Sequence, residues 1–464
     1  MAPALVAAVL GGWRLTGPSL WADELATWGA VRLSWDQLWR LSGSVDAVLT
    51  PYYAVMKAYV SVAGTSTTAL RFPAVVAIVA TAVLVSALGR RLVGAGAGLL
   101  AGLIFAVLPV TSRYEQEARP YAFVMFAATL GLLCLIRLLE RPTIGRLAGY
   151  SGAVALAGLC HPLSALLALG GHGAAVVWRQ FRADGKNWRA TSYWLAAAAV
   201  GAAPALVLLA LGSRQQTQIS WIKQLTVDTV QVVPDRLFLS GAVGGLVLAL
   251  AVLGVRRDLD RVCLACAAFV PLIGLLLAGA VAPVWVARYV LVSLPPLAVL
   301  AAAAALRVGR AHAVVIFLLT AALGYPEQLQ VRTSAGHSED SAKIAAVIRP
   351  LYRPGDVAVF PDSHPSIPWA PRDIYERYLP APKPPDVLRT TAPRTGGRLL
   401  ATECADASCL GDPARIWLIR VDNPADPFQS MAPGKQKRLQ ERYAVAQRWQ
   451  YSLLTVILLV RKTG

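Results

Sequence analysis

Long apolar runs separated by short polar loops recur along most of this chain. A run of about 20 apolar residues crosses a bilayer as one helix. We expect no cleavable signal peptide, because the first run leads into Trp13 and Arg14 without a small-residue cleavage site. The pattern predicts a polytopic α-helical membrane protein with about eleven spans, at 2–18, 73–89, 93–110, 121–138, 147–160, 163–178, 191–212, 236–254, 262–281, 289–306 and 312–325.

Composition agrees with a chain that lies mostly in lipid. Of its 464 residues, 56% are hydrophobic and 15% are charged, and the mean hydropathy is +0.53. Soluble domains carry about 25% charged residues. The net charge of +18 comes largely from short loops between the apolar runs. This distribution argues against nucleic-acid binding.

Basic residues gather in every second loop, which gives the predicted topology. By the positive-inside rule these loops are cytoplasmic. The N-terminus is then cytoplasmic, and everything after the last span is extracytoplasmic. We therefore expect a multi-pass protein of the cell membrane whose basic loops are Arg90–Arg91, Arg137–Arg146, Arg179–Arg189, Arg256–Arg261 and Arg307–Arg310.

The first predicted outer loop is long, at about 20–72. Trp35, Leu38, Trp39 and Leu41 recur in it at helical spacing, which predicts an amphipathic helix on the membrane surface. The apolar segment Tyr52–Val62 is too short to span the bilayer. The loop therefore belongs to a transmembrane domain at 1–325 without adding a span.

The tail, 326–464, is richer in proline and mixed charge and predicts a small extracytoplasmic α/β domain. A helix is expected at 341–351, and buried strands at 356–360, 415–419 and 453–460. Cys404 and Cys409 are expected to pair as a disulfide, provided that the tail is outside the cytoplasm. The other cysteines lie in apolar segments, and Cys263-x-x-Cys266 has no second pair or nearby histidine, so no metal site is expected.

Two adjacent carboxylates, Asp23 and Glu24, directly follow the first apolar run. Carboxylates are costly near hydrocarbon, so the pair suggests a function. An ionised carboxylate that reaches a hydroxyl group acts as a general base. The alternative is a pair of interfacial polar residues near a helix end.

Three further polar positions fall on the same predicted face. The loop Ser112–Tyr121 holds Arg119, and Arg288-Tyr289 precedes the tenth span. Guanidinium groups suit an anionic lipid phosphate. The alternatives are a solvated turn with internal ion pairs and an interfacial arginine in an aromatic belt. His161, at a predicted outer boundary, is interpreted by default as a hydrogen-bonded structural histidine.

At these residues the chain resembles the family-39-like membrane glycosyltransferases of the C superfamily, a group that includes protein O-mannosyltransferases and the lipid A aminoarabinose transferase. The resemblance covers nearly the whole chain. It implies inverting transfer of a sugar, mannose-like, from a polyprenyl-phosphate donor to an extracytoplasmic glycan, lipid or protein. The motifs that carry it are Trp21-Ala22-Asp23-Glu24, Asp46–Tyr53, Arg71-Phe72-Pro73, Gln116–Tyr121, and Arg288-Tyr289 followed by Pro295-Pro296.

The resemblance also implies roles for single residues. Asp23 is expected to be the base and Glu24 its support or an acceptor contact. Arg119, Arg288 and Tyr289 are expected to hold the leaving lipid phosphate. No cofactor is expected, and a divalent cation is not indicated, because the first outer loop has no Asp-x-Asp motif. Further candidate contacts to the acceptor or sugar are Asp46, Tyr53, Glu117, Tyr121 and His161.

Two other functions compete with this one. A transporter or lipid flippase usually places ionisable residues near the bilayer midplane on broken helices. Here the predicted spans are mostly free of such residues, which crowd the predicted outer boundary. A non-catalytic assembly or sensor protein that displays the C-terminal domain is the third interpretation.

Overall fold

The computed structural model describes residues 1–182, 188–215, 221–363 and 367–462. The chain divides into two compact units. Unit 1 comprises Met1–Leu15, Asp46–Tyr52 and Thr68–Gln330, and unit 2 comprises Thr16–Val45, Tyr53–Thr67 and Val331–Gly464. The predicted first outer loop therefore contributes to both units, mainly to unit 2.

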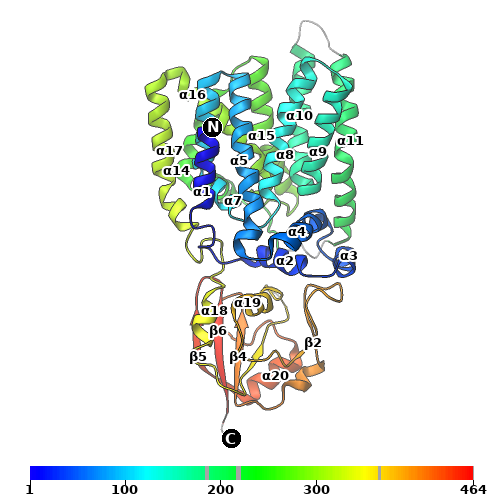
Figure 1. The fold of residues 1–464 in the computed structure, drawn as a ribbon, viewed down its shortest axis with the longest axis vertical. Coiled ribbons are helices and arrows are strands. Elements are labelled where there is room, and N and C mark those ends of the chain that lie inside the picture. Colours follow the sequence, from blue (N-terminus) through cyan, green and yellow to red (C-terminus); the bar gives the residue numbers. More distant parts are fainter. Residues whose placement is uncertain (183–187, 216–220, 364–366, 463–464) are drawn as a thin grey trace. The chain divides into compact units, whose positions relative to one another are not determined.

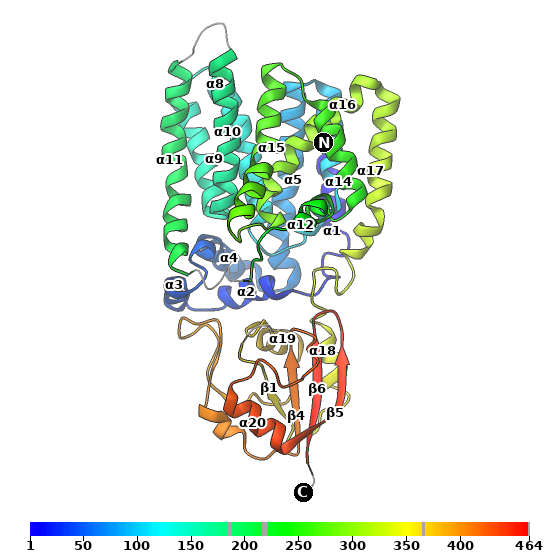
Figure 2. The ribbon, with the colours of Figure 1, turned by 180° about the vertical axis from the view of Figure 1, so that it is seen from behind.

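Unit 1 is helical (Figures 1 and 2). Its 3-10 helices are η1 (Ala47–Leu49) and η3 (Ala287–Ser293). Its α-helices are α1 (Ala2–Gly12), α5 (Thr67–Leu92), α6 (Ala95–Val107), α7 (Pro109–Glu115), α8 (Tyr121–Glu140), α9 (Ile144–Cys160), α10 (Pro162–Arg182), α11 (Trp188–Gly212), α12 (Val227–Gln231), α13 (Val233–Phe238), α14 (Gly241–Gly254), α15 (Leu259–Val281), α16 (Leu294–Val308) and α17 (Arg310–Gln330).

A helix lies at each of the eleven predicted spans, but not all are long enough to cross a bilayer. Among the described residues, six helices pass by length and composition, and α6 with α7 makes a seventh if that bent pair is one span. The helices α1, α9 and α14 are apolar but shorter. The first predicted span, 2–18, was too long, because α1 ends at Gly12 and Arg14 has a φ of 52°. The protein is thus polytopic, with six to seven candidate spans.

Small residues let the helices of unit 1 approach closely. A Cβ atom on Gly254 of α14 would lie 2.1 Å from the Leu300 carbonyl oxygen of α16. A Cβ atom on Gly201 of α11 would lie 2.9 Å from the Ser151 carbonyl oxygen of α9. Such contacts are the usual way in which helices associate where lipid removes the hydrophobic drive between them.

A bend between α6 and α7 prepares the polar loop that follows. Leu108 is extended, Pro109 begins α7, and the two helices meet at 66°. Directly after α7, the amide nitrogen of Gln116 donates to the carbonyl oxygens of Gly11 at 2.9 Å and of Trp13 at 2.8 Å. These two hydrogen bonds satisfy carbonyl groups at the C-terminal end of α1, which have no partner inside the helix.

The first part of unit 2 comes from the predicted outer loop. It contains α2 (Ala22–Val31), α3 (Trp35–Ser44) and most of α4 (Thr50–Ala63). Ser34 and Gln37 form a capping box at the start of α3. Leu38 and Leu41 are buried, whereas Trp35 and Trp39 are exposed. The predicted amphipathic helix is therefore present, and its position on the membrane surface stays a prediction.

The second part of unit 2 is the predicted mixed α/β region. Its main sheet has the order β1-β4-β6-β5, with β1 parallel to β4 and the other pairs antiparallel. The strands are β1 (Val357–Val359), β2 (Arg389–Thr391), β3 (Thr402–Glu403), β4 (Arg415–Arg420), β5 (Tyr443–Gln450) and β6 (Thr455–Arg461). The helices are α18 (Lys343–Ile348), α19 (Ala370–Tyr378), α20 (Pro433–Arg442) and η4 (Ala405–Leu410).

The three predicted strands are confirmed as β1, β4 and β6, and the predicted helix at 341–351 is α18. The strand β5 was not predicted. It is an edge strand whose side chains are mostly exposed, so it lacks the apolar run that marked the other three.

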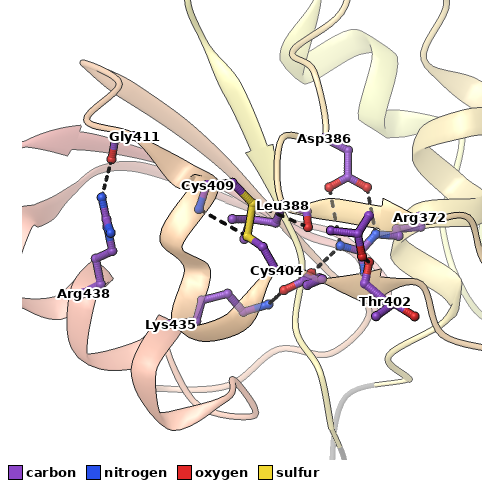
Figure 3. The surroundings of a disulfide bond; sticks show 11 residues. Arg372, Asp386, Leu388, Thr402, Cys404, Cys409, Gly411, Lys435 and Arg438 are labelled. Carbon is purple, nitrogen blue, oxygen red and sulfur yellow. Dashed lines mark hydrogen bonds and ion pairs between the residues drawn. A yellow bond between two sulfur atoms is a disulfide. The ribbon is translucent and has the colours of Figure 1, made fainter.

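Cys404 and Cys409 form a disulfide beside a buried ion-pair network (Figure 3). Their Cα atoms are 6.3 Å apart. Next to it, Lys435 donates to Glu403 at 2.7 Å, and the guanidinium of Arg372 also pairs with Glu403. Burial would raise the pKa of the Glu403 carboxyl, but the charges of Lys435 and Arg372 hold it below its ordinary value. The network stabilises unit 2 as long as Glu403 is ionised.

Candidate active site

The acidic pair lies in the first turn of α2, in unit 2. The N-terminus of a helix carries a partial positive charge that stabilises carboxylates. Asp23 is half-buried, and Glu24 is fully buried. The Oε2 atom of Glu24 lies 3.5 Å from Nδ1 of His337. The two carboxylates therefore have different surroundings although they are neighbours in sequence.

In unit 1, five residues form what we call the arginine–tyrosine cluster: Arg119, Tyr121, His161, Arg288 and Tyr289. The Nε atom of Arg288 donates to the Tyr121 hydroxyl at 2.8 Å. Its guanidinium carbon lies 5.8 Å from the ring centre of Tyr121 and 6.0 Å from that of Tyr289. Aromatic faces at such distances attract a cation. The arrangement holds the Arg288 guanidinium in one place.

His161 lies between the two tyrosines of this cluster, in the connection between α9 and α10. Its ring centre is 4.7 Å from that of Tyr289 and 5.5 Å from that of Tyr121. Desolvation, and next the positive charges of Arg288 and Arg119, lower the pKa of His161 to about 3. His161 is therefore neutral near pH 7, and both arginine charges act at this position.

The cluster is braced from α10. The Ser164 hydroxyl lies 2.8 Å from Nδ1 of His161 and donates to the Tyr289 carbonyl oxygen at 2.7 Å. Tyr114 meets Tyr121 edge to face with 5.4 Å between ring centres. Side chains from α7, α8, α10 and η3 thus support one cationic position.

Glu117 does not stand as an isolated carboxylate. It is fully buried and pairs with Arg113 at 2.8 Å. The Arg119 backbone N–H donates to the Glu117 carbonyl oxygen at 2.9 Å, which orders the turn before Tyr121. These contacts order the loop before Tyr121, and a contact of Glu117 to the acceptor or sugar stays a prediction.

The two remaining candidates fall in different units. Asp46, in unit 1, has a φ of 56° and precedes η1. A left-handed backbone is uncommon outside glycine but is tolerated by aspartate. Tyr53 belongs to unit 2 and is buried in α4. The structure therefore does not bring these two together within one unit.

Sequence reasoning missed several neighbours of the site. Trp221 presents its ring 5.3 Å from the Arg288 guanidinium and follows residues outside those described. Ser164 and His337 carried no motif. The contacts of Trp221 with Arg288 and of His337 with Glu24 join residues far apart in sequence, so they are visible only in the folded chain. Within the described ranges, no group of three or more His, Cys, Asp or Glu residues is arranged to hold a metal ion.

Comparison with known proteins gives one family and one fold. Residues 50–210 match the family model for dolichyl-phosphate-mannose-protein mannosyltransferase. No curated protein matches the chain by sequence.

The solved structures show a likeness of fold over nearly the whole chain. ArnT from Cupriavidus metallidurans in the apo state covers 99% of this chain and 97% of its own, with a TM-score of 0.64 and 14% identity. The same protein bound to undecaprenyl phosphate covers 99% of this chain and 97% of its own, with a TM-score of 0.60 and 13% identity. A third structure is the archaeal oligosaccharyltransferase AglB from Archaeoglobus fulgidus in complex with an inhibitory peptide and a dolichol-phosphate. It covers 98% of this chain and 73% of its own, with a TM-score of 0.51 and 11% identity.

The fold and the family match together define the class: this is a polytopic membrane glycosyltransferase with the fold of ArnT. Within that class, residues 50–210 are similar to the dolichyl-phosphate-mannose-protein mannosyltransferase family, and the enzyme is polyprenyl-phosphate-dependent.

Proposed function

We propose that this protein is an inverting glycosyltransferase that moves a mannose-like sugar from a polyprenyl-phosphate donor to an acceptor outside the cytoplasm. The observation that carries the proposal is the arginine–tyrosine cluster, in which a guanidinium is fixed by Tyr121 beside a second arginine charge. A leaving phosphate needs such preorganised positive charge.

The chemistry divides between the two groups of residues. Asp23 accepts the proton of the acceptor hydroxyl, whose oxygen attacks the anomeric carbon of the sugar. The bond between that carbon and the phosphate oxygen breaks from the opposite face, so the configuration inverts. Polyprenyl phosphate leaves with the bonding electron pair, and Arg119 and Arg288, with Tyr289, stabilise its charge. Glu24 is buried against His337 and supports Asp23 rather than contacting the acceptor.

The same proposal gives the topology. The basic loops are cytoplasmic, all eleven helices at the predicted spans lie in the membrane domain, and the acidic pair and the α/β region are extracytoplasmic. The Cys404–Cys409 disulfide supports this orientation, because disulfides persist in oxidising compartments. The site needs no cofactor and no divalent cation.

The test is turnover of defined donors by the full-length protein in lipid nanodiscs. Polyprenyl-phosphate-linked mannose, glucose and aminopentose are each supplied with a cell-envelope extract as acceptor. We expect protein-dependent release of polyprenyl phosphate from one donor, and a product whose anomeric configuration is opposite to that of the donor. Retention of configuration would exclude the single displacement. Movement of intact donor across a liposome membrane, without release, would favour a flippase.

A further inference from the structure

The helix that carries the acidic pair has no cap of its own. Its N-cap residue is Trp21, whose side chain makes no capping hydrogen bond. Ser, Thr, Asp or Asn is usual at this position, because an oxygen must accept from the free N–H groups of the first turn. In α2 the missing acceptor comes from a residue 317 positions later: the Ala22 N–H donates to Oε2 of Glu339 at 3.3 Å.

Glu339 acts with its neighbours in the segment Val331–Ser341. His337 meets Glu24 at 3.5 Å, with both side chains fully buried. The Ser19 N–H donates to the Ser334 carbonyl oxygen at 2.9 Å. The chain just before α2 and its first turn are therefore held by one C-terminal segment of the same unit.

That segment is in turn tied to the main sheet. The Asp340 N–H donates to the Ser452 carbonyl oxygen at 3.0 Å, in the turn between β5 and β6. The Ser452 hydroxyl donates to the Ser338 carbonyl oxygen at 2.5 Å. The segment Val331–Ser341 thus links the main sheet to the first turn of α2.

A second contact reaches the last turn of α2 from another part of the tail. The Arg394 guanidinium is held by Asp373 of α19 through two bonds of 2.8 and 2.6 Å. A Cβ atom on Gly29 would lie 2.4 Å from Nη1 of this guanidinium. Because Asp373 binds the guanidinium through both carboxylate oxygens, a Cβ atom at position 29 would have to displace a paired side chain.

We infer that His337, Glu339 and Arg394 are positioning residues for the acidic pair, so that the C-terminal α/β region is part of the catalytic apparatus. The inference rests on the proposed function. It requires that the tail set where the Asp23 carboxylate lies, whereas Asp23 itself carries the chemistry. Misplacement of a catalytic group by about 1 Å costs on the order of 100-fold in rate.

The first experiment compares variants at position 337 in the donor-release assay with full-length protein. We expect His337→Ala to lower kcat by about 10- to 100-fold with little change in KM for the donor. His337→Asn retains a nitrogen donor close to the place of Nδ1 and is expected to recover most of the loss. His312→Ala, at an exposed histidine of α17, is the matched control.

A second pair of variants avoids any change of charge. Gly29→Ala places a methyl group against Arg394 and is expected to lower kcat about tenfold. Gly43→Ala, in the neighbouring helix α3, meets nothing within 4 Å and is expected to leave kcat unchanged. Both changes add the same methyl group to a helix of unit 2, so a difference between them reports the contact with Arg394.

The outcomes separate this inference from the proposed function. An inactive wild-type protein with every donor contradicts the proposed function. An active wild type with unchanged kcat in His337→Ala and Gly29→Ala overturns the positioning role alone. Equal losses in His337→Ala and His337→Asn, accompanied by a lower unfolding temperature, also overturn it, because they indicate a fold defect. A kcat loss that Asn restores supports it.

Discussion

The arginine–tyrosine cluster of unit 1 and the acidic pair of unit 2 are built in opposite ways. The side chains of the cluster come from helices of unit 1 that pack together. Within it Tyr121 accepts a hydrogen bond from Arg288, and Ser164 bonds to His161. The acidic pair depends on residues from the far end of the chain, among them Glu339 and His337. Under the proposed function, the cluster attracts a charged phosphate and tolerates small shifts, whereas Asp23 as the base must meet one proton. The group with the stricter geometry has the longer-range support.

The largest effect is expected at the base. Asp23→Asn keeps the size of the side chain but removes its ability to accept a proton, so kcat should fall by about 10³-fold. Donor release by full-length protein is the measurement. The control is Asp36→Asn, which changes an exposed aspartate in the first turn of α3. Near-normal turnover in Asp23→Asn would remove Asp23 from the mechanism, and the acidic pair would then have no catalytic role to compare with that of the cluster.

The next effect tests the cationic side. Arg288→Ala removes the fixed guanidinium and should lower kcat/KM for the donor by about 100-fold. Arg288→Lys keeps the charge but not the fork that meets Tyr121, and should fall between alanine and wild type. Arg236→Ala, at an exposed arginine of α13, serves as the control. If lysine were no better than alanine, geometry rather than charge would define this position.

A smaller effect isolates one hydrogen bond inside the cluster. Tyr121→Phe removes the hydroxyl that accepts from Arg288 at 2.8 Å but keeps the ring against His161 and Tyr114. Hydrogen bonds to charged groups contribute about 1.5–3 kcal/mol, and we expect the low end of that range, about a tenfold rise in KM for the donor. The exposed Tyr325→Phe is the control. A loss as large as that of Arg288→Ala would mean that Tyr121 contacts the donor directly.

The same contrast explains how far the sequence alone reaches. Helices near all eleven predicted spans, the amphipathic α3 and three strands follow from apolar periodicity, a local property. The phosphate-binding roles of Arg288 and Tyr289 come from the family resemblance and stay predictions. The partners of the acidic pair follow from neither the periodicity nor the resemblance. Neither His337 nor Glu339 has a local signal, since a buried contact between distant residues leaves no periodic trace. The lengths of α1 and α14 were also missed, because α1 ends at Gly12, and α14 begins after Ser240 and ends at Gly254, all within apolar sequence.

The smallest predicted effect separates the two regions by acid stability. Lys435 and Arg372 hold the pKa of the Glu403 carboxyl below its ordinary value of 4.5 although burial alone would raise it. A carboxylate of this kind stabilises the folded state above that pH, and the contribution disappears as the pH falls through the lowered value.

We therefore expect unit 2 to lose stability below about pH 4.5. Glu403→Gln should lower the unfolding midpoint at pH 6 by roughly 5 °C and flatten its fall towards pH 3. The matched control is Glu441→Gln in α20, whose pair with Lys437 is exposed and worth little. The measurement is thermal unfolding of the full-length protein, followed by tryptophan fluorescence and paired with donor release after return to pH 7.

The stability of unit 2 should also decide activity in acid. Because the acidic pair belongs to unit 2 and His161 stays neutral down to about pH 3, activity should be lost together with unit 2. Equal acid sensitivity of Glu403→Gln and wild type would show that the Lys435–Glu403–Arg372 network does not control it.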